Sequence, residues 1–166
     1  MASRYDTDTV VTQSLIDRLI DRDLTLNGDP PVSRAQSIRL LKAALRRDLE
    51  WLLNSRRVAE PSPNDFALLG KSLFFYGLPD FSAFSLNSPR DRNSLLRELE
   101  RSVAYYEPRL KGIRVSLVES PSNVLRVVRF QIEGLLMMDP APEQISFDTV
   151  LQLSSGEYEI KGDRNA

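Results

Sequence analysis

Apolar residues recur every three or four positions through much of the first two thirds of the chain, the spacing typical of amphipathic helices. Ser33 followed by Gln36 has the form of a capping box, so a helix is expected to begin after Ser33 and to end near Asn54. The apolar stripe that should pack this helix against a sheet comprises Ile38, Leu41, Leu45, Leu49 and Leu52.

Shorter helical patterns flank this segment. Ser14 opens a short amphipathic helix over residues 14–20, and another short helix is expected over residues 64–74. Ser88 followed by Pro89 predicts a third start, because proline fits the first helical position. That helix should end before Pro108, since the residue preceding a proline avoids the helical conformation. The loop around Gly77 is rich in apolar residues, so we expect it to be packed down.

The periodicity changes from helical to alternating after Lys111, which predicts strands with one buried face. Three such runs lie between residues 113 and 153, and a short edge strand is expected over residues 158–160. Short connections between the runs favour an antiparallel meander. Helices first and strands last predict an α+β fold, with N-terminal helices packed on a small C-terminal, mainly antiparallel β-sheet.

The length of 166 residues suits one domain with its own core rather than two. We expect a flexible N-terminal tail over residues 1–13, a single domain over residues 14–160 and a C-terminal tail over residues 161–166.

Composition narrows the chemistry. The chain has no histidine and no cysteine, which excludes Ser-His-Asp and Cys-His nucleophiles, Cys/His zinc sites and disulfides. Two carboxylates would suffice for glycoside hydrolysis, but nothing in the sequence marks such a pair among Glu98, Glu100, Glu107 and Glu133. We therefore expect no catalytic residue, no metal and no cofactor, and the alternative is a peptidoglycan-cleaving enzyme that uses paired carboxylates.

The charge pattern argues against two further classes of partner. The net charge is −1, so a basic coat for nucleic acid is not expected, although the segment 33–57 has seven basic residues and two acidic ones. No apolar run approaches the ~20 residues that a membrane-spanning helix needs. The polar start of the chain lacks the features of a secretory signal, so we expect a cytoplasmic protein without direct membrane insertion.

Two apparent ligand motifs are incomplete. Gly70-Lys71-Ser72 resembles the end of a phosphate-binding loop, but Asp65 stands where the pattern requires glycine. The acidic stretch that begins at Asp21 lacks the glycine and the final glutamate of a calcium-binding loop.

Glu107, Pro108 and Arg109 form the most informative motif, at the junction between the last helix and the first strand. Two interpretations remain open from the residues alone. The glutamate and the arginine could pair locally and fix the turn, or a rigid turn could present Arg109 to carboxylates or carbonyls of a partner.

Five segments in order and spacing resemble one known family. They are Ser14-Leu15-Ile16-Asp17-Arg18-Leu19, Arg47-Asp48-Leu49-Glu50-Trp51-Leu52-Leu53-Asn54-Ser55-Arg56-Arg57, Tyr76-Gly77-Leu78-Pro79-Asp80-Phe81-Ser82, Glu107-Pro108-Arg109-Leu110 and Phe147-Asp148-Thr149-Val150-Leu151. Together they resemble the TssE family, the small baseplate wedge subunits of type VI secretion systems. This family is similar to the lysozyme-like wedge protein of contractile phage tails.

The resemblance implies a scaffold. Members of that family join the wedge subunits TssF and TssG, with TssK a further candidate, and are thought to template the sheath of TssB and TssC. It also implies that Glu107, Pro108 and Arg109 bind a partner. A small meander leaves edges with unpaired main-chain groups, so we further expect the sheet to offer an edge to the sheath, unless the N-terminal segment covers that edge.

Overall fold

The structure is a computed structural model that describes residues 10–20, 33–59, 66, 68–81, 88–118, 127–152 and 156–163. Its helical elements are α1 (Leu15–Leu19), α2 (Arg34–Asn54), two 3-10 turns, η1 (Leu69–Lys71) and η2 (Leu73–Phe75), and α3 (Pro89–Tyr106). The expected caps are present, because Ser14, Ser33 and Ser88 each accept a hydrogen bond from a backbone N–H of the first turn.

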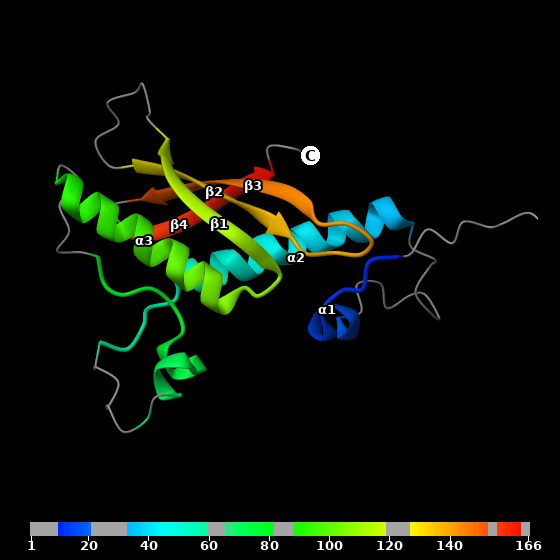
Figure 1. The fold of residues 1–166 in the computed structure, drawn as a ribbon, viewed down its shortest axis with the longest axis horizontal. Helices are drawn as coiled ribbons and strands as arrows, with labels where there is room; N and C mark the ends of the chain where they lie inside the picture. The colour runs from blue at the N-terminus through cyan, green and yellow to red at the C-terminus, as the bar shows by residue number, and fades with distance from the viewer. Residues whose placement is uncertain are drawn as a thin grey trace, which may run out of the picture.

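The second half of the chain forms an antiparallel meander in the order β1-β2-β3-β4. Its strands are β1 (Leu110–Val118), β2 (Val127–Leu136), β3 (Glu143–Gln152) and β4 (Glu157–Asp163). The α+β prediction is therefore confirmed, with the helices in the N-terminal half and the sheet at the C-terminus (Figure 1). The last strand is longer than the expected edge over residues 158–160, because its pairing with β3 continues as far as Asp163.

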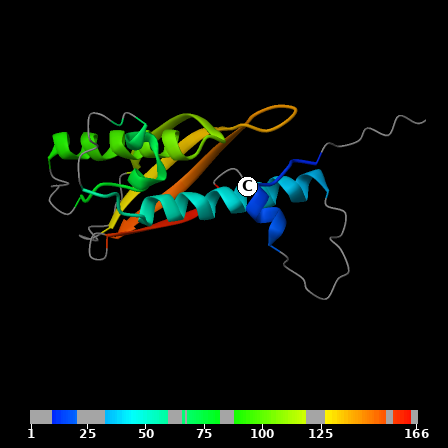
Figure 2. The same cartoon turned by 90° about the horizontal axis from the view of Figure 1, so that it is seen from below.

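One apolar core joins both long helices to one face of the sheet. The predicted stripe of α2 is buried at four of its five positions, with Leu45 and Leu49 fully inaccessible, and Ile38 is half-buried. These leucines share a cluster with Leu95 and Leu99 of α3 and with inward-facing residues of all four strands. α3 packs beside β1 and α2 packs beside β4, so each helix lies near one edge of the sheet (Figure 2).

One polar atom in this core has no partner. The Thr149 side chain is 1% exposed, and among the described residues its hydroxyl is the buried side-chain group that makes no hydrogen bond. A threonine at an inward position of a strand keeps the β-branched shape that suits the sheet. Its hydroxyl, however, gives up hydrogen bonds to water on folding, which costs free energy when no partner replaces them.

The segment after α2 runs beside the loop that follows η2. Leu78 donates to the Ser55 carbonyl at 2.8 Å and accepts from the Arg57 N–H at 2.8 Å, which makes a short parallel bridge. Gly77 lies at this crossing with φ +103°, and a Cβ there would stand 2.4 Å from the Ser55 oxygen. The backbone approach therefore requires glycine.

The segment before this loop differs from the expected short helix. Ser72 interrupts it and caps η2, so the chain makes two 3-10 turns instead of one α-helix. Phe75 and Leu78 are buried as expected for a packed loop. Phe74 is exposed, however, so the expectation of a packed loop around Gly77 holds only in part. Three apolar residues of the segment where a helix was expected, Phe66, Leu68 and Leu73, are exposed as well. The start of the predicted helix, Asn64, lies outside the described residues, as does the acidic stretch from Asp21.

Candidate partner-binding site

Glu107, Pro108 and Arg109 form a tight turn between α3 and β1. Glu107 is the C-cap of α3, and its carbonyl accepts from the Leu110 N–H at 3.1 Å. The Glu107 carboxylate turns back and accepts from the Arg109 N–H at 3.2 Å. On the other side, the Arg109 carbonyl accepts from the Met137 N–H at 2.8 Å, which ties the turn to the end of β2.

The Arg109 guanidinium pairs with two carboxylates of its own chain. Its Nε donates to Glu107 Oε1 at 2.6 Å, and its Nη2 donates to Glu107 Oε2 at 2.5 Å and to Asp48 Oδ2 at 2.6 Å. Glu107 is only 5% exposed, so its negative charge depends on this partner. The hydrogen bonds to Glu107 outweigh the cost of burial and, with Asp48, raise the pKa of Arg109 above its usual value.

The pairing continues from the turn to α1. Arg47 donates through Nε and Nη2 to Asp48 Oδ1 and through Nη1 to Asp17 Oδ1, the last at 2.7 Å. Asp17 also accepts from the Ser14 hydroxyl. Burial alone would raise the pKa of Asp17, but the hydrogen bonds from Ser14 and Arg47 hold it below its usual value. We call Asp17, Arg47, Asp48, Glu107 and Arg109 the ionic cluster.

A groove of about 620 Å³ opens beside the ionic cluster. Its walls come from α1, from α2 and from the turn after α3, with apolar contributions from Leu15, Ile16, Trp51, Tyr76 and Pro108. Trp51 is 60% exposed, and the Arg47 guanidinium lies 5.1 Å from the centre of its ring, within range of a cation–π interaction.

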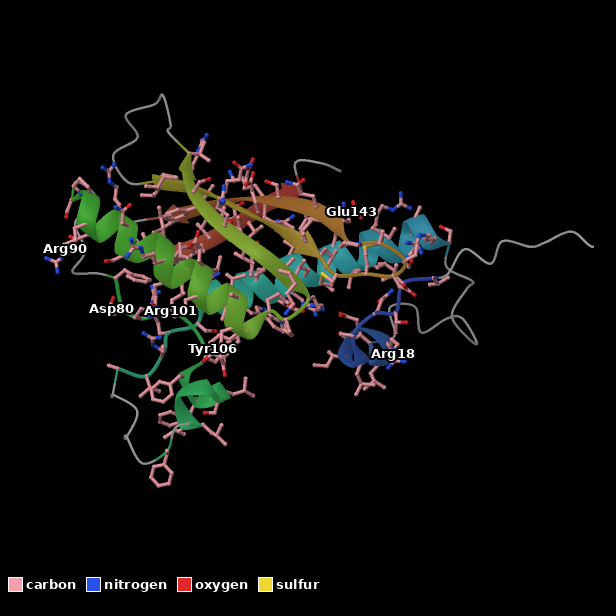
Figure 3. All side chains as sticks on the ribbon, in the orientation of Figure 1. Arg18, Asp80, Arg90, Arg101, Tyr106 and Glu143 are labelled. Carbon is pink, nitrogen blue, oxygen red and sulfur yellow. The ribbon has the colours of Figure 1, made fainter. Side chains whose placement is uncertain are left out.

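Two tyrosines, Tyr76 and Tyr106, are among the residues that line the groove. The rings of Tyr76 and Tyr106 meet edge to face, with their centres 5.1 Å apart. Tyr106, labelled in Figure 3 at the C-terminal end of α3, donates through its hydroxyl to the Ser72 carbonyl at 3.4 Å. Burial, together with the charges of Asp48 and Glu107, raises the pKa of Tyr76.

A model of the family described as baseplate wedge protein gp25 matches residues 39–141. The chain belongs to this family. The matched residues run from the first half of α2 to the loop after β2, so they include the Glu107-Pro108-Arg109 turn and the α2 wall of the groove. No curated protein matches the chain. Membership makes the chain a structural baseplate component of the phage tail type.

Several carboxylates of this wedge protein pair with arginines. Asp17, Asp48 and Glu107 each bond to an arginine of the ionic cluster. In a second cleft, beside Tyr105, Glu98 bonds to both Arg57 and Arg101.

The described part of this wedge protein has neither a set of metal ligands nor a helix that could span a membrane. No cluster of three or more aspartate or glutamate side chains there could hold a metal ion. No helix in that part combines the length and the apolar character that crossing a bilayer demands.

The sequence located the turn but not the contacts around it. The local Glu107–Arg109 pair, one of the two interpretations left open, is present. The contacts of Asp48 and Asp17 were not predicted, because Asp48 lies 61 residues before its partner Arg109 and Asp17 lies 30 residues before its partner Arg47. A usable signal was Asp17 itself, a charged residue that follows two apolar residues in a short helix and is only 5% exposed in the structure.

Proposed function

We propose that this chain is a subunit of a type VI secretion baseplate that joins the wedge and templates assembly of the contractile sheath. The observation that carries the proposal is the match to the baseplate wedge family across α2, α3, β1 and β2. The five sequence segments that resemble the TssE family support the assignment to type VI secretion rather than to a phage tail.

The proposed docking site for TssF and TssG is the groove with the Glu107-Pro108-Arg109 turn at its end. Within the chain Arg109 is already neutralised by Glu107 and Asp48, so a new carboxylate would have to compete with both. We therefore expect apolar contacts with Trp51 and Pro108 to supply most of the binding energy, while Arg109 keeps the turn in shape and offers its remaining N–H groups. TssK is a further candidate partner, and TssB and TssC are the expected sheath partners.

Capture of co-expressed TssF and TssG by the tagged chain tests this site. Trp51→Ala should reduce capture at least tenfold without loss of stability, because Trp51 is largely exposed. Leu73→Ala is the matched control, since Leu73 is 79% exposed, apolar and outside the groove, and should capture like the wild type.

Arg109→Ala separates the two roles of the turn. We expect a protein that still folds, although less stably because buried Glu107 loses its ion-pair partner, and that captures TssF and TssG more weakly because the turn loses its shape. Unfolding of the isolated variant would assign the motif to the fold alone. Release of muropeptides from peptidoglycan by the wild type, abolished by Glu107→Gln, would favour the enzyme instead of the scaffold.

A further inference from the structure

The solvent-facing side of α3 carries a row of three exposed arginines, Arg90, Arg97 and Arg101. Successive residues of an α-helix are about 100° apart, so residues that follow Arg90 by about seven and eleven positions lie within about 20° of it around the helix axis. The three arginines therefore form one line along α3, which we call the arginine stripe. Figure 3 shows Arg90 at the N-terminal end of α3, pointing away from the sheet.

The positive charge of the arginine stripe is open to solvent. The acidic residues of α3 are half-buried, whereas the residues beside the stripe include exposed Ser94 and Ala104, which are small and uncharged. In the described part of the chain, neither Arg90 nor Arg97 bonds to a carboxylate. The Arg101 side chain is 76% exposed. A partner that brings its own carboxylates could therefore reach all three guanidinium groups.

Arg101 has one internal contact, and that contact can be exchanged. Glu98 Oε1 accepts from Arg57 Nη1 at 2.9 Å, whereas Glu98 Oε2 accepts from Arg101 Nη1 at the longer distance of 3.3 Å. The Glu98 side chain is largely buried and keeps Arg57 as its partner when Arg101 turns away. Moving Arg101 to a new carboxylate thus leaves no buried charge unpaired.

A cleft of about 600 Å³ opens where the arginine stripe reaches the C-terminal half of α3. Arg101 and Tyr105 line it, and Val58, Phe75 and Pro79 add apolar surface from outside the helix. Tyr105 and Val58 are both partly exposed, so this apolar surface is accessible from solvent. The stripe and the cleft are continuous through Arg101, and none of the three arginines lines the groove beside the ionic cluster.

We propose that the arginine stripe and this cleft bind an acidic segment of another protein, with its carboxylates on the arginines and one apolar side chain in the cleft. Charge complementarity identifies the carboxylates. Along the axis of α3 the arginines follow one another at about 10 Å and about 6 Å, so acidic residues at the same helical spacing in a partner would face them. This surface is a second binding site, and it does not depend on the docking of TssF and TssG in the groove.

Phosphates are the other anions that a row of arginines could bind, and the cleft argues against them. Asp80 and Glu98 line the cleft, and their carboxylates would repel a phosphate backbone. The apolar surface of Val58 and Phe75 fits an aliphatic or aromatic side chain instead. The net charge of −1 also provides no general attraction for nucleic acid. A protein segment is therefore the favoured occupant.

Fluorescence anisotropy of the full chain with a labelled synthetic peptide tests the inference. The probe is a helical peptide of about 20 residues that has glutamates at the spacing of the arginine stripe and one phenylalanine beyond the last of them. In the comparison probe, glutamine replaces each glutamate. The acidic probe should bind roughly tenfold more tightly, and about 0.5 M salt should remove this preference. Equal affinity for both probes at low salt would overturn the inference.

Charge reversal on α3 locates the binding site. The double variant Arg90→Glu/Arg97→Glu should bind the acidic probe roughly tenfold more weakly than the wild type. The matched control is Arg92→Glu/Arg129→Glu, which changes the net charge equally at two exposed arginines, one on another side of α3 and one on β2. The control should bind like the wild type. Equal weakening in both double variants would show that net charge, not the arginine stripe, attracts the probe.

Tyr105→Ala tests the cleft. The variant should bind the acidic probe with phenylalanine more weakly, and it should bind a probe with alanine in place of that phenylalanine like the wild type. An equal loss for both probes would overturn the placement of the apolar side chain in the cleft. Every substituted position is exposed, so each variant should melt like the wild type.

Two other occupants give different results. An RNA or DNA probe that binds more tightly than the acidic peptide, and that Arg90→Glu/Arg97→Glu releases, would replace the protein segment by nucleic acid. Self-association that the same variant abolishes would assign the surface to a second copy of this chain. Capture of TssF and TssG by this variant should equal that of the wild type, so failure of the peptide experiment leaves the proposed function untouched. If the double variant does not fold, the two probes on the wild type still decide.

Discussion

The two sides of α2 stabilise the protein in different ways. On the inner side, Leu45, Leu49 and Leu53 are fully buried among apolar neighbours of α3 and the sheet. On the outer side, Arg47 and Asp48 are half-buried in a chain of ion pairs that joins α1 to the turn after α3. The inner contacts depend on packing and area, whereas the outer contacts depend on charge and therefore on pH and salt.

A substitution on the inner side of α2 should have the largest effect on the free energy of unfolding. Leu45→Ala removes a fully buried side chain and leaves a cavity, so we expect the free energy of unfolding to fall by roughly 2–5 kcal/mol in a urea titration. Leu19→Ala, at a leucine that is 75% exposed on α1, is the control and should change it by less than about 0.5 kcal/mol. An unchanged melting temperature for Leu45→Ala would mean that the wrong face of α2 has been assigned to the core.

The outer side should show a smaller effect that depends on pH. Asp17→Asn removes the charge that pairs with Arg47 and is expected to cost roughly 1.5–3 kcal/mol at pH 7. The pKa of Asp17 is lowered in the folded state from 3.8, so its contribution is complete above pH 3.8 and is lost as the pH falls through the lower folded value.

Thermal melting of both proteins from pH 7 down to pH 2 measures this contribution. The stability of the wild type should fall toward that of Asp17→Asn in the acid range. A constant difference between the two proteins across that range would show that the charge of Asp17 is not what stabilises α1.

The smallest expected effect on stability is a gain rather than a loss. Thr149→Val replaces a buried hydroxyl without a partner by a methyl group of similar shape, so stability should rise by about 1 kcal/mol. The urea midpoint would report the change, with Thr12→Val, at an exposed position, as the control. A loss of stability would indicate that the Thr149 hydroxyl has a partner in solution.

Much of the fold could be predicted because its signals are local. Ser33 and Ser88 mark helix starts by their own side chains, and the alternation after Lys111 marks strands without reference to the rest of the chain. The 3-10 turns were missed because Ser72 caps a new turn inside a segment with helical spacing, and periodicity does not register a cap of that kind.

The candidate site could be predicted only in part. The Glu107–Arg109 pair lies within one turn, so spacing was enough to suggest it. The contacts of Arg109 with Asp48 and of Arg47 with Asp17 bridge 61 and 30 positions, and they exist only once α1, α2 and α3 are assembled. The Asn54 side chain at the end of α2 likewise bonds to the main chain of Tyr158 in β4, 104 positions away, so this contact could not be predicted from the pattern of strands.

The close backbone approach at Gly77 limits which substitutions this position can accept during evolution. Gly77 and Gly112 both have positive φ, but a Cβ at Gly77 would collide with the Ser55 backbone, whereas nothing lies within 4 Å of one at Gly112. In a library of all substitutions selected for folded protein, asparagine and aspartate should survive at position 112, since both tolerate that backbone conformation. At position 77 every codon except those for glycine should be depleted, because any side chain would force the loop away from the end of α2.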